Sequence, residues 1–182
     1  MNLKALHHYL TTLSPSEEKY RNGYIYDGWK DMPKKQHNGV EYSVLDLDVA
    51  YFSLDNKPPS HAPGLNAELS EISIKRNSRF SAVPEHIHTH IEINYVYSGS
   101  CPQFIDGHPI TLQKNQVLLI DTNCPHSIAP LGENDIMISI IPKTDFLREH
   151  MFNQFSNDSI LSRFFINAIN EKTDHDLSLI HI

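Results

Sequence analysis

Cysteine is nearly absent from this sequence, with Cys101 and Cys124 the only two in 182 residues. That excludes a disulfide framework and the paired-cysteine spacing of a zinc ribbon. Basic residues are also scarce, with 15 Lys and Arg against 22 Asp and Glu, so the formal net charge is −7. We do not expect such a chain to bind a phosphate backbone by itself. No apolar run approaches the roughly 18 residues that cross a bilayer, and the N-terminus lacks the apolar core of a signal peptide. A cytoplasmic protein without a membrane partner is expected.

Helical periodicity opens the chain and then gives way to a linker. Four leucines recur at helical spacing, as in one stripe of an amphipathic helix: Leu3, Leu6, Leu10 and Leu13. A second helix start follows, because Ser14 can cap, Pro15 suits the first helical position and Glu17 can complete a capping box. Residues 56–64 are rich in proline and break regular structure. We predict that residues 1–64 form a helical and aromatic extension that ends in this linker.

Short β-prone runs separated by turn residues fill residues 65–142. Their spacing of about eight to twelve residues is typical of an antiparallel sandwich or barrel. Six apolar side chains in these runs are expected to be largely buried: Ile87, Ile91, Ile93, Val117, Leu119 and Ile138. After Pro142 the period becomes helical, which predicts an α-helical hairpin at residues 143–174. Residues 175–182 are interpreted as the start of a truncated linker.

Twelve histidines are present, and three of them alternate with other residues in segment 84–99. If this segment is one strand, its side chains alternate between two faces. One face then carries five polar residues in a row: His86, His88, His90, Glu92 and Asn94. Such a row is either the solvated outer face of an antiparallel sheet or the polar lining of a barrel.

The second interpretation allows a metal site. Histidines two apart on a strand lie about 7 Å apart along the backbone, so His86 and His88 can converge on one ion, with Glu92 adding an oxygen ligand. His126, which follows Cys124-Pro125, offers a remote fourth donor. The expected ion is divalent, such as Zn, Fe, Mn or Ni. A weakly bound or absent metal is the alternative.

These residues resemble the two cupin motifs. Four of them have the spacing of the first motif: His86, His88, Glu92 and Gly99. Residues 115–126 resemble the second motif, with His126 as its histidine. Four positions depart from the motifs, which have glycine, glycine, proline and asparagine in place of Phe80, Asn115, Asp121 and Pro130. None of the four is a ligand position, so the departures concern loop geometry more than metal chemistry.

A longer pattern resembles the sensory domain of AraC-type transcription regulators over residues 68–172. It continues from the first motif through Asp106-Gly107-His108-Pro109-Ile110 and residues 116–120 to residues 125–128. The resemblance implies a cupin barrel (double-stranded β-helix or jelly roll) at residues 65–142, a small effector inside it, and a dimerising helical hairpin. It also implies a C-terminal pair of helix-turn-helix motifs, but no paired basic helices follow Asp174. We therefore expect a sensor fragment that binds DNA only through a domain absent from this chain.

Two further functions compete with effector sensing. One is a small metal-dependent cupin enzyme, such as a dioxygenase or sugar isomerase, which would use the same metal ligands. The other is a structural cupin dimer without a ligand. The apolar hairpin, followed by an abrupt stop, favours the regulator, so no catalytic residue and no enzymatic activity are predicted. The expected effector is a polar metabolite, and the resemblance to AraC-type regulators favours a carbohydrate.

The remaining predictions concern single residues. The ligand pocket is expected to be lined by His86, His88, His90, Glu92, Asn94 and His126. A homodimer is expected to form through the second helix of the hairpin, because its stripe exceeds what a small barrel covers: Ile160, Leu161, Phe164, Phe165, Ala168 and Ile169. Cys124 is interpreted as a small apolar residue rather than a nucleophile. Tyr95 and Tyr97 are expected on the face opposite Glu92.

Overall fold

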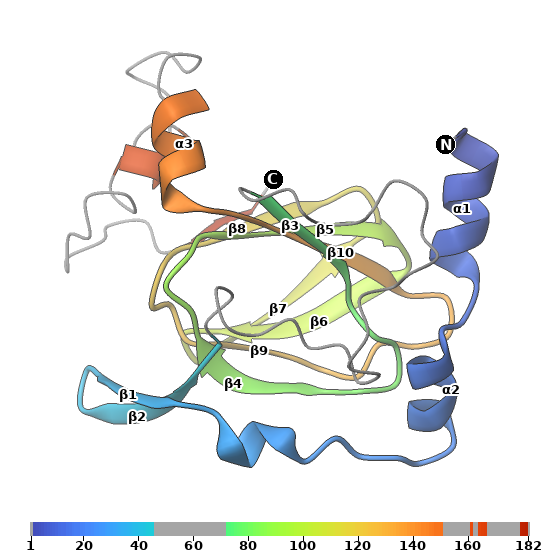
Figure 1. Ribbon diagram of the computed structural model, residues 1–182, viewed down its shortest axis with the longest axis horizontal. Coiled ribbons are helices and arrows are strands. Elements are labelled where there is room, and N and C mark those ends of the chain that lie inside the picture. The colour runs from blue at the N-terminus through green and yellow to red at the C-terminus, as the bar shows by residue number, and fades with distance from the viewer. Residues whose placement is uncertain (1, 46–71, 151–160, 162–163, 167–178, 182) are drawn as a thin grey trace.

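Two β-sheets face each other and enclose the core of the protein (Figure 1). The computed structural model describes residues 2–45, 72–150, 161, 164–166 and 179–181, and the structural statements below concern these residues. One sheet has the strand order β1-β2-β4-β9-β6-β7, and the other has the order β11-β8-β5-β10-β3. The strands are β1 Lys34–His37, β2 Val40–Val44, β3 Ile72–Arg76, β4 Val83–Ile87, β5 Glu92–Ser98, β6 Ser100–Ile105, β7 His108–Gln113, β8 Val117–Ile120, β9 His126–Ile128, β10 Ile136–Pro142 and β11 Leu179–His181.

The core lies between the two sheets. Its buried side chains come from both of them and from the adjoining loops: Val96, Cys101, Ile105, Leu112, Leu118, Ile120, Cys124, Ile128, Leu131 and Met137. Apart from the parallel pair β2–β4, the described strands pair antiparallel. The predicted mainly β barrel of the cupin type is confirmed. No described helix is long and apolar enough to cross a membrane.

Two segments outside residues 65–142 add strands to these sheets. The hairpin of β1 and β2 joins the six-stranded sheet through β4, with Ser43 opposite His86. At the other end, β11 pairs with β8, with Leu179 opposite Ile120. The sequence pattern did not indicate these strands. Their partner strands lie more than 40 residues away in the sequence, a pairing that local patterns do not reveal.

Two helices open the chain, as predicted. Helix α1 spans Leu3–Thr11, and the Asn2 side chain accepts a hydrogen bond from the Ala5 amide at its start. Helix α2 spans Pro15–Arg21 and begins with the full capping box: Ser14 Oγ accepts from the Glu17 amide, and Glu17 accepts from the Ser14 amide. A short 3-10 helix, η1, follows at Gly28–Asp31.

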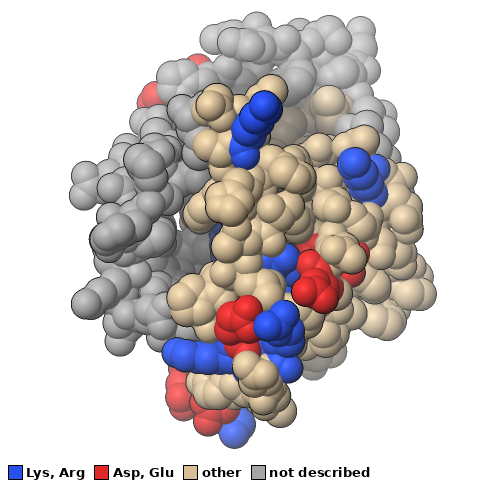
Figure 2. Space-filling view, turned by 90° about the vertical axis from the view of Figure 1, so that its right-hand side faces the viewer, with Lys and Arg blue, Asp and Glu red and all other residues tan. Residues whose placement is uncertain are grey.

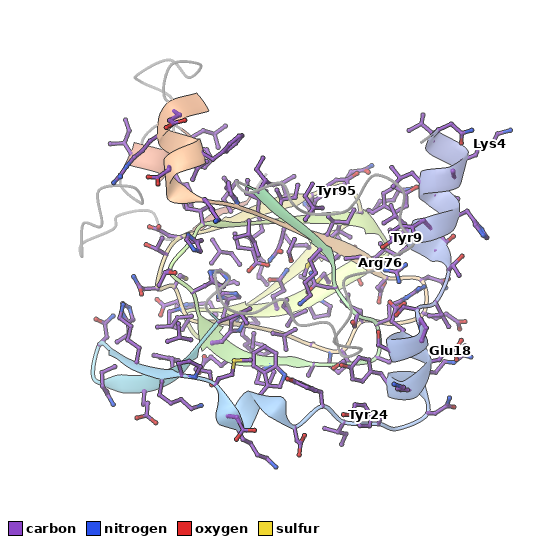
Figure 3. All side chains as sticks on the ribbon, in the orientation of Figure 1. Lys4, Tyr9, Glu18, Tyr24, Arg76 and Tyr95 are labelled. Atoms are coloured by element: carbon purple, nitrogen blue, oxygen red, sulfur yellow. The ribbon has the colours of Figure 1, made fainter. Side chains whose placement is uncertain are left out.

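Arginines from the barrel hold these helices in place. Glu17 is fully buried, and its carboxylate accepts hydrogen bonds from Arg76 at 2.8 Å and from the Arg79 side chain at 2.9 and 3.1 Å. Arg76 also lies over the Tyr9 ring, 5.5 Å from its centre (Figure 3). The two guanidinium groups donate to the main-chain carbonyls that end α1 and to one in the β9–β10 loop: Tyr9, Leu10, Thr11, Thr12 and Glu133.

The outer surface of this helical corner carries charges of both signs. Figure 2 shows the side of the molecule on which α1 and α2 lie, and its acidic and basic side chains are neighbours. Arg21, for example, forms ion pairs with Glu18 at 2.7 Å and with Glu133 at 3.6 Å. Exposed pairs of this kind contribute little stability, about 0–1 kcal/mol. The buried Glu17 network is therefore the main polar attachment of the helices.

A second apolar cluster covers the outer face of the five-stranded sheet. Helix α3, at Thr144–His150, contributes Leu147, which packs with Ile91, Leu119, Phe164 and Phe165. Of the six side chains expected to be buried, Ile87, Ile91 and Leu119 are at most 4% exposed. The other three are less completely covered, because they lie on the outer face of this sheet: Ile93, Val117 and Ile138.

The same cluster contains two residues of the expected dimer interface. Phe164 is 0% exposed and Phe165 is 5% exposed, and both pack within the chain. In the single chain the barrel thus covers more of the helical stripe than its size suggested, and the role of these rings in a dimer stays a prediction. Leu161 packs half-buried beside them. The other three predicted interface residues lie outside the described residues: Ile160, Ala168 and Ile169.

Two departures from the cupin motifs keep the backbone shape of glycine. Phe80 has φ 65° and Asn115 has φ 68°, both in the left-handed region that glycine adopts freely. Gly99, which matches its motif, has φ 70°, and a Cβ there would collide with Asp135. The loop geometry thus survives these two substitutions, at a cost of about 1–2 kcal/mol for a side chain such as that of Phe80.

Candidate functional site

The histidine-rich segment turns a corner of the barrel. Strand β4 ends at Ile87 and β5 begins at Glu92, and the two strands belong to different sheets. The segment is therefore not one strand, although the alternation of polar and apolar residues continues through residues 88–91. The corner nevertheless brings His86, His88 and Glu92 together. His126 joins them on β9, directly opposite His86.

Three imidazoles converge at this corner. His86, His88 and His126 are at most 2% exposed, and each offers a ring nitrogen within 4.8 Å of the other two. The centres of the His86 and His126 rings are 4.3 Å apart, and those of His88 and His126 are 4.6 Å apart. Glu92 completes the group, with Oε2 lying 2.8 Å from His88 Nε2 and 3.2 Å from His126 Nε2.

Main-chain carbonyls fix the orientation of all three rings. Each Nδ1 lies 2.9 or 3.0 Å from the carbonyl oxygen of a residue two positions away: His86 with Pro84, His88 with His90, and His126 with Cys124. A carbonyl only accepts hydrogen bonds, so each Nδ1 donates to its carbonyl, which leaves Nε2 as the nitrogen that each ring offers to the cluster. Metal-binding histidines are commonly oriented in this way.

Burial and hydrogen bonding together set the charges of the cluster. Burial lowers the pKa of His86 and His88, and the neighbouring imidazoles lower both further. Burial works to raise the pKa of Glu92, but its hydrogen bonds with His126 and His88 outweigh burial and hold that pKa well below its usual range. The histidine nitrogens and the Glu92 carboxylate therefore converge on one point, where a cation can replace the protons that they share. Three histidine nitrogens and one carboxylate oxygen are a common ligand set for a divalent transition metal, so the residues fit such an ion.

The other predicted pocket residues take different places. Asn94 lies inside the barrel, 0% exposed, and its Oδ1 accepts a hydrogen bond from Ser139 at 2.8 Å. His90 supplies its main-chain carbonyl to His88, while its ring is not part of the group of converging nitrogens. The Tyr95 hydroxyl donates to Asn115, consistent with the expected outward position of this side chain.

An aromatic residue from the N-terminal extension completes the site. The Trp29 ring on η1 lies 5.6 Å from the His86 ring, centre to centre, and Tyr26 packs edge-on against Trp29 at 6.4 Å. We did not predict this contact. The sequence carried a weak signal for it, because residues 20–29 are rich in aromatic side chains, but their distant partner His86 could not be identified from spacing.

Neither cysteine offers a nucleophile. Cys101 and Cys124 are both free and buried, and burial raises the pKa of each thiol to about 12. Both therefore remain protonated at neutral pH, when a nucleophile would need the thiolate. The interpretation of Cys124 as a small apolar residue agrees with its place in the inner core.

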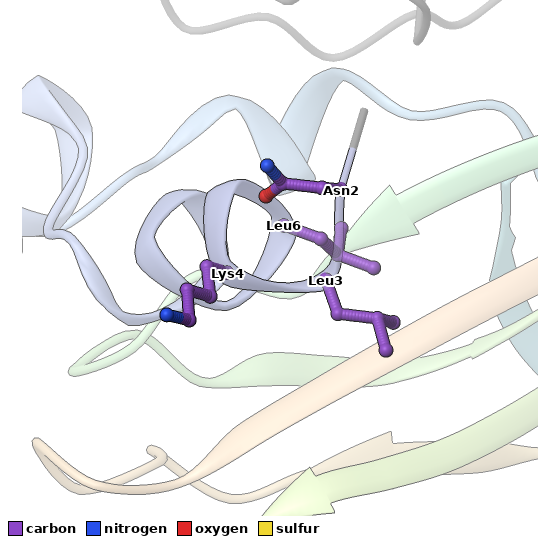
Figure 4. A pocket seen from close by; sticks show the side chains of 4 residues that line it. All are labelled: Asn2, Leu3, Lys4 and Leu6. Carbon is purple, nitrogen blue, oxygen red and sulfur yellow. The ribbon is translucent and has the colours of Figure 1, made fainter.

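A surface pocket lies away from the histidine cluster. It is lined by Asn2, Leu3, Lys4 and Leu6 at the start of α1, outside the barrel (Figure 4). Leu3 is 84% exposed there. This lining has no converging polar groups, so we place the candidate functional site at the histidine cluster.

Comparison with known proteins identifies the barrel. Residues 70–142 match the model of the AraC-like ligand binding domain. These residues are similar to that domain. The match covers fewer than half of the 182 residues, and it contains His86, His88, Glu92 and His126. Among curated proteins, none matches the sequence.

Several solved structures are similar to parts of this chain. An RmlC-like cupin from Shewanella frigidimarina is 20% identical over 40% of this chain and 66% of its own, with a TM-score of 0.35. A cupin from Bacteroides fragilis is 24% identical over 49% of this chain and 75% of its own, with a TM-score of 0.36. ToxT from Vibrio cholerae, bound to an unsaturated fatty acid, is 14% identical over 61% of this chain, with a TM-score of 0.41. This chain spans only 39% of ToxT and 65% of a Streptococcus pyogenes protein of unknown function.

Proposed function

We propose that this chain senses a small polar metabolite inside its barrel and controls, through that binding, a DNA-reading domain of an AraC-type transcription regulator. The observation that carries the proposal is a buried polar cluster within the segment that matches the AraC-like ligand-binding domain. A barrel built only for stability would fill this position with apolar side chains, because buried polar groups cost free energy unless they are satisfied. Carbohydrates are the effector class that the family resemblance favours.

The chain's own residues suggest how binding would be transmitted. His86, His88, His126 and Glu92 would hold a divalent metal, which would supply a Lewis acid to bind oxygen atoms of the effector. Trp29 rests against His86, so an effector at the cluster would contact η1 as well as the barrel. If η1 can take two positions, an effector that binds better to one of them increases the fraction of molecules in that position. The chain is predicted to form a homodimer, and the shift would change how its two copies contact each other. Sedimentation of the chain tests whether the homodimer forms.

A metal-dependent cupin enzyme is the second candidate. The observation in its favour is the same ligand set, since three histidines and one carboxylate leave coordination positions for a substrate on a six-coordinate ion. The two functions differ in outcome. A sensor returns its bound metabolite unchanged, whereas an enzyme loaded with metal converts it, which mass spectrometry of the released ligand distinguishes.

Thermal unfolding with a panel of metabolites tests the sensing function. We expect at least one sugar or sugar derivative to raise the melting temperature by several degrees, because a ligand at a hundred times its Kd adds about 2.7 kcal/mol of stability. His126→Ala should abolish the shift. His108→Ala replaces an exposed histidine on β7 and should keep it. A panel without any effect, or an effect that persists in His126→Ala, would contradict the proposal.

A further inference from the structure

The edge strand β3 points a lysine into the barrel. Lys75 lies opposite Ser139 on β10, and Ser139 lies opposite Asn94 on β5. Residues directly opposite in antiparallel strands point to the same face of the sheet. Ser139 and Asn94 are 2% and 0% exposed and are hydrogen-bonded to each other inside the barrel. Lys75, Ser139 and Asn94 therefore form one row across the inner surface.

The Lys75 ammonium lacks a counter-ion at contact distance within the part of the chain that the structure describes. No described carboxylate forms an ion pair with it, although Glu92, two strands away on the same inner face, attracts it. Protein around the ammonium lowers the pKa of Lys75 by desolvation, although the residue as a whole is exposed. Both facts suit a residue on an edge strand at the opening of a barrel, where protein surrounds the ammonium and a small molecule can still reach it.

Asn94 offers a second unused donor in the same row. Ser139 Oγ accepts a hydrogen bond from Asn77 Nδ2 at 2.6 Å and donates to Asn94 Oδ1 at 2.8 Å, which fixes the orientation of the Asn94 amide. Asn94 Nδ2 is fully buried and has no hydrogen-bond partner among the described residues. A buried donor without a partner is costly. Asn94 is two residues from Glu92 on β5, so this donor lies beside the histidine cluster.

We propose that Lys75 and Asn94 form an anion subsite next to the histidine cluster, so that the effector is a small hydroxycarboxylate, such as a sugar acid. This inference rests on the proposed function and narrows its ligand. The Lys75 ammonium would pair with the carboxylate of the effector, and Asn94 Nδ2 would donate to the same group. The effector's hydroxyl oxygens would face the cluster. A neutral sugar would leave the ammonium unpaired in a partly desolvated position.

A carboxylate suits this subsite better than a phosphate. The row offers one cation, the Lys75 ammonium, and one amide donor. A phosphate dianion would bring a second negative charge without a further cation among the described inner residues to balance it. One negative charge matches one ammonium.

Calorimetric titration with matched probes tests this subsite. Gluconate, galactonate and glycerate are each compared with their neutral counterparts glucose, galactose and glycerol, on the full chain. We expect at least one acid to bind, and its neutral counterpart to bind at least about tenfold more weakly, because a hydrogen-bonded charge pair is lost. Lys75→Met should weaken binding of the acid at least about tenfold and leave the neutral probe unchanged. Lys75→Arg, which keeps the charge, should restore part of the affinity.

Two controls separate this subsite from folding and from surface charge. Lys114→Met removes an exposed lysine at the β7–β8 turn and should not change binding. The melting temperature of ligand-free Lys75→Met should equal or exceed that of the wild type, because a partly desolvated ammonium is removed. A large decrease in that temperature would show that Lys75 serves the fold, and would overturn its assignment to a ligand.

The remaining outcomes distinguish this inference from the proposed function. Neutral sugars that bind as tightly as the acids, with no effect of Lys75→Met, would overturn the anion subsite and leave metabolite sensing intact. Inorganic phosphate that binds more tightly than every acid, in a manner lost in Lys75→Met, would overturn the carboxylate assignment. If neither the acids nor any other metabolite binds, both proposals fail.

Discussion

Replacing Glu17 with alanine is expected to lower the free energy of unfolding by about 3–5 kcal/mol. The carboxylate is fully buried and accepts hydrogen bonds from Arg76, Arg79 and the Ser14 amide. Its removal leaves Arg79, which is 2% exposed, without the counter-ion that offsets the cost of burying its charge. It also breaks the capping box of α2. Urea unfolding at neutral pH, monitored by circular dichroism, measures the difference.

Glu18→Ala is the matched control for this result. Glu18 lies one residue further along α2 and forms an exposed pair with Arg21, so its loss should cost no more than about 1 kcal/mol. Equal effects of the two substitutions would contradict the view that Arg76 and Arg79 attach the N-terminal helices to the barrel through Glu17.

The same carboxylate predicts a dependence of stability on pH. Burial tends to raise the pKa of Glu17, but the hydrogen bonds from Arg79 and Ser14 and the charge of Arg76 lower it below the ordinary value of 4.5. A lowered pKa means that the stabilisation is fully present above the ordinary value and is lost as the pH falls below it. The difference in unfolding free energy between the wild type and Glu17→Gln should therefore be largest near neutral pH and shrink below pH 4.5. A constant difference down to pH 3 would contradict this.

Phe165→Glu is expected to destabilise the chain itself by about 3–5 kcal/mol. The ring is 5% exposed and packs with Ile91, Leu119 and Leu147, so the substitution removes apolar contacts and buries an unpaired charge. Phe104→Glu is the control, because that ring is 48% exposed on β6. It should change the free energy of unfolding by no more than about 0.5 kcal/mol.

The two measurements needed for Phe165→Glu are urea unfolding and sedimentation. Unchanged stability together with a smaller sedimenting mass would show that the ring faces a second copy of the chain. That outcome would support the interface expected from the sequence. Reduced stability without a change in mass would place Phe165 in the packing of the barrel with α3.

Local patterns predicted the parts of the fold that depend on neighbouring residues. The capping box at Ser14 and Glu17 depends only on positions three apart, and the structure contains it. The partners of Glu17 could not be predicted in this way, because Arg76 and Arg79 are about 60 residues distant. The addition of β11 to β8 likewise depends on a contact between distant segments.

The metal ligands were predicted because motif spacing encodes them, whereas their surroundings were not. Trp29 reaches His86 only through the path of the N-terminal extension. Lys75 was missed because alternation in β3 suggests that its isoleucines face inward. In the structure Ile74 is 41% exposed, and Lys75 shares the inner face with Ser139. The polarity of a strand indicates its inner face only when the interior is apolar, and this interior is partly polar.

Metal content of the purified chain tests the central claim most directly, namely that the histidine cluster is a ligand site built around a divalent cation. The protein is prepared without a polyhistidine tag and dialysed against Zn²⁺ or Mn²⁺ and then against metal-free buffer. Its metal content is measured by inductively coupled plasma mass spectrometry. We predict about one ion per chain in the wild type and in His108→Ala, and almost none in His88→Ala/His126→Ala, which keeps too few ligands for tight binding. A wild type without bound metal, or a double variant with the same content, would contradict the claim.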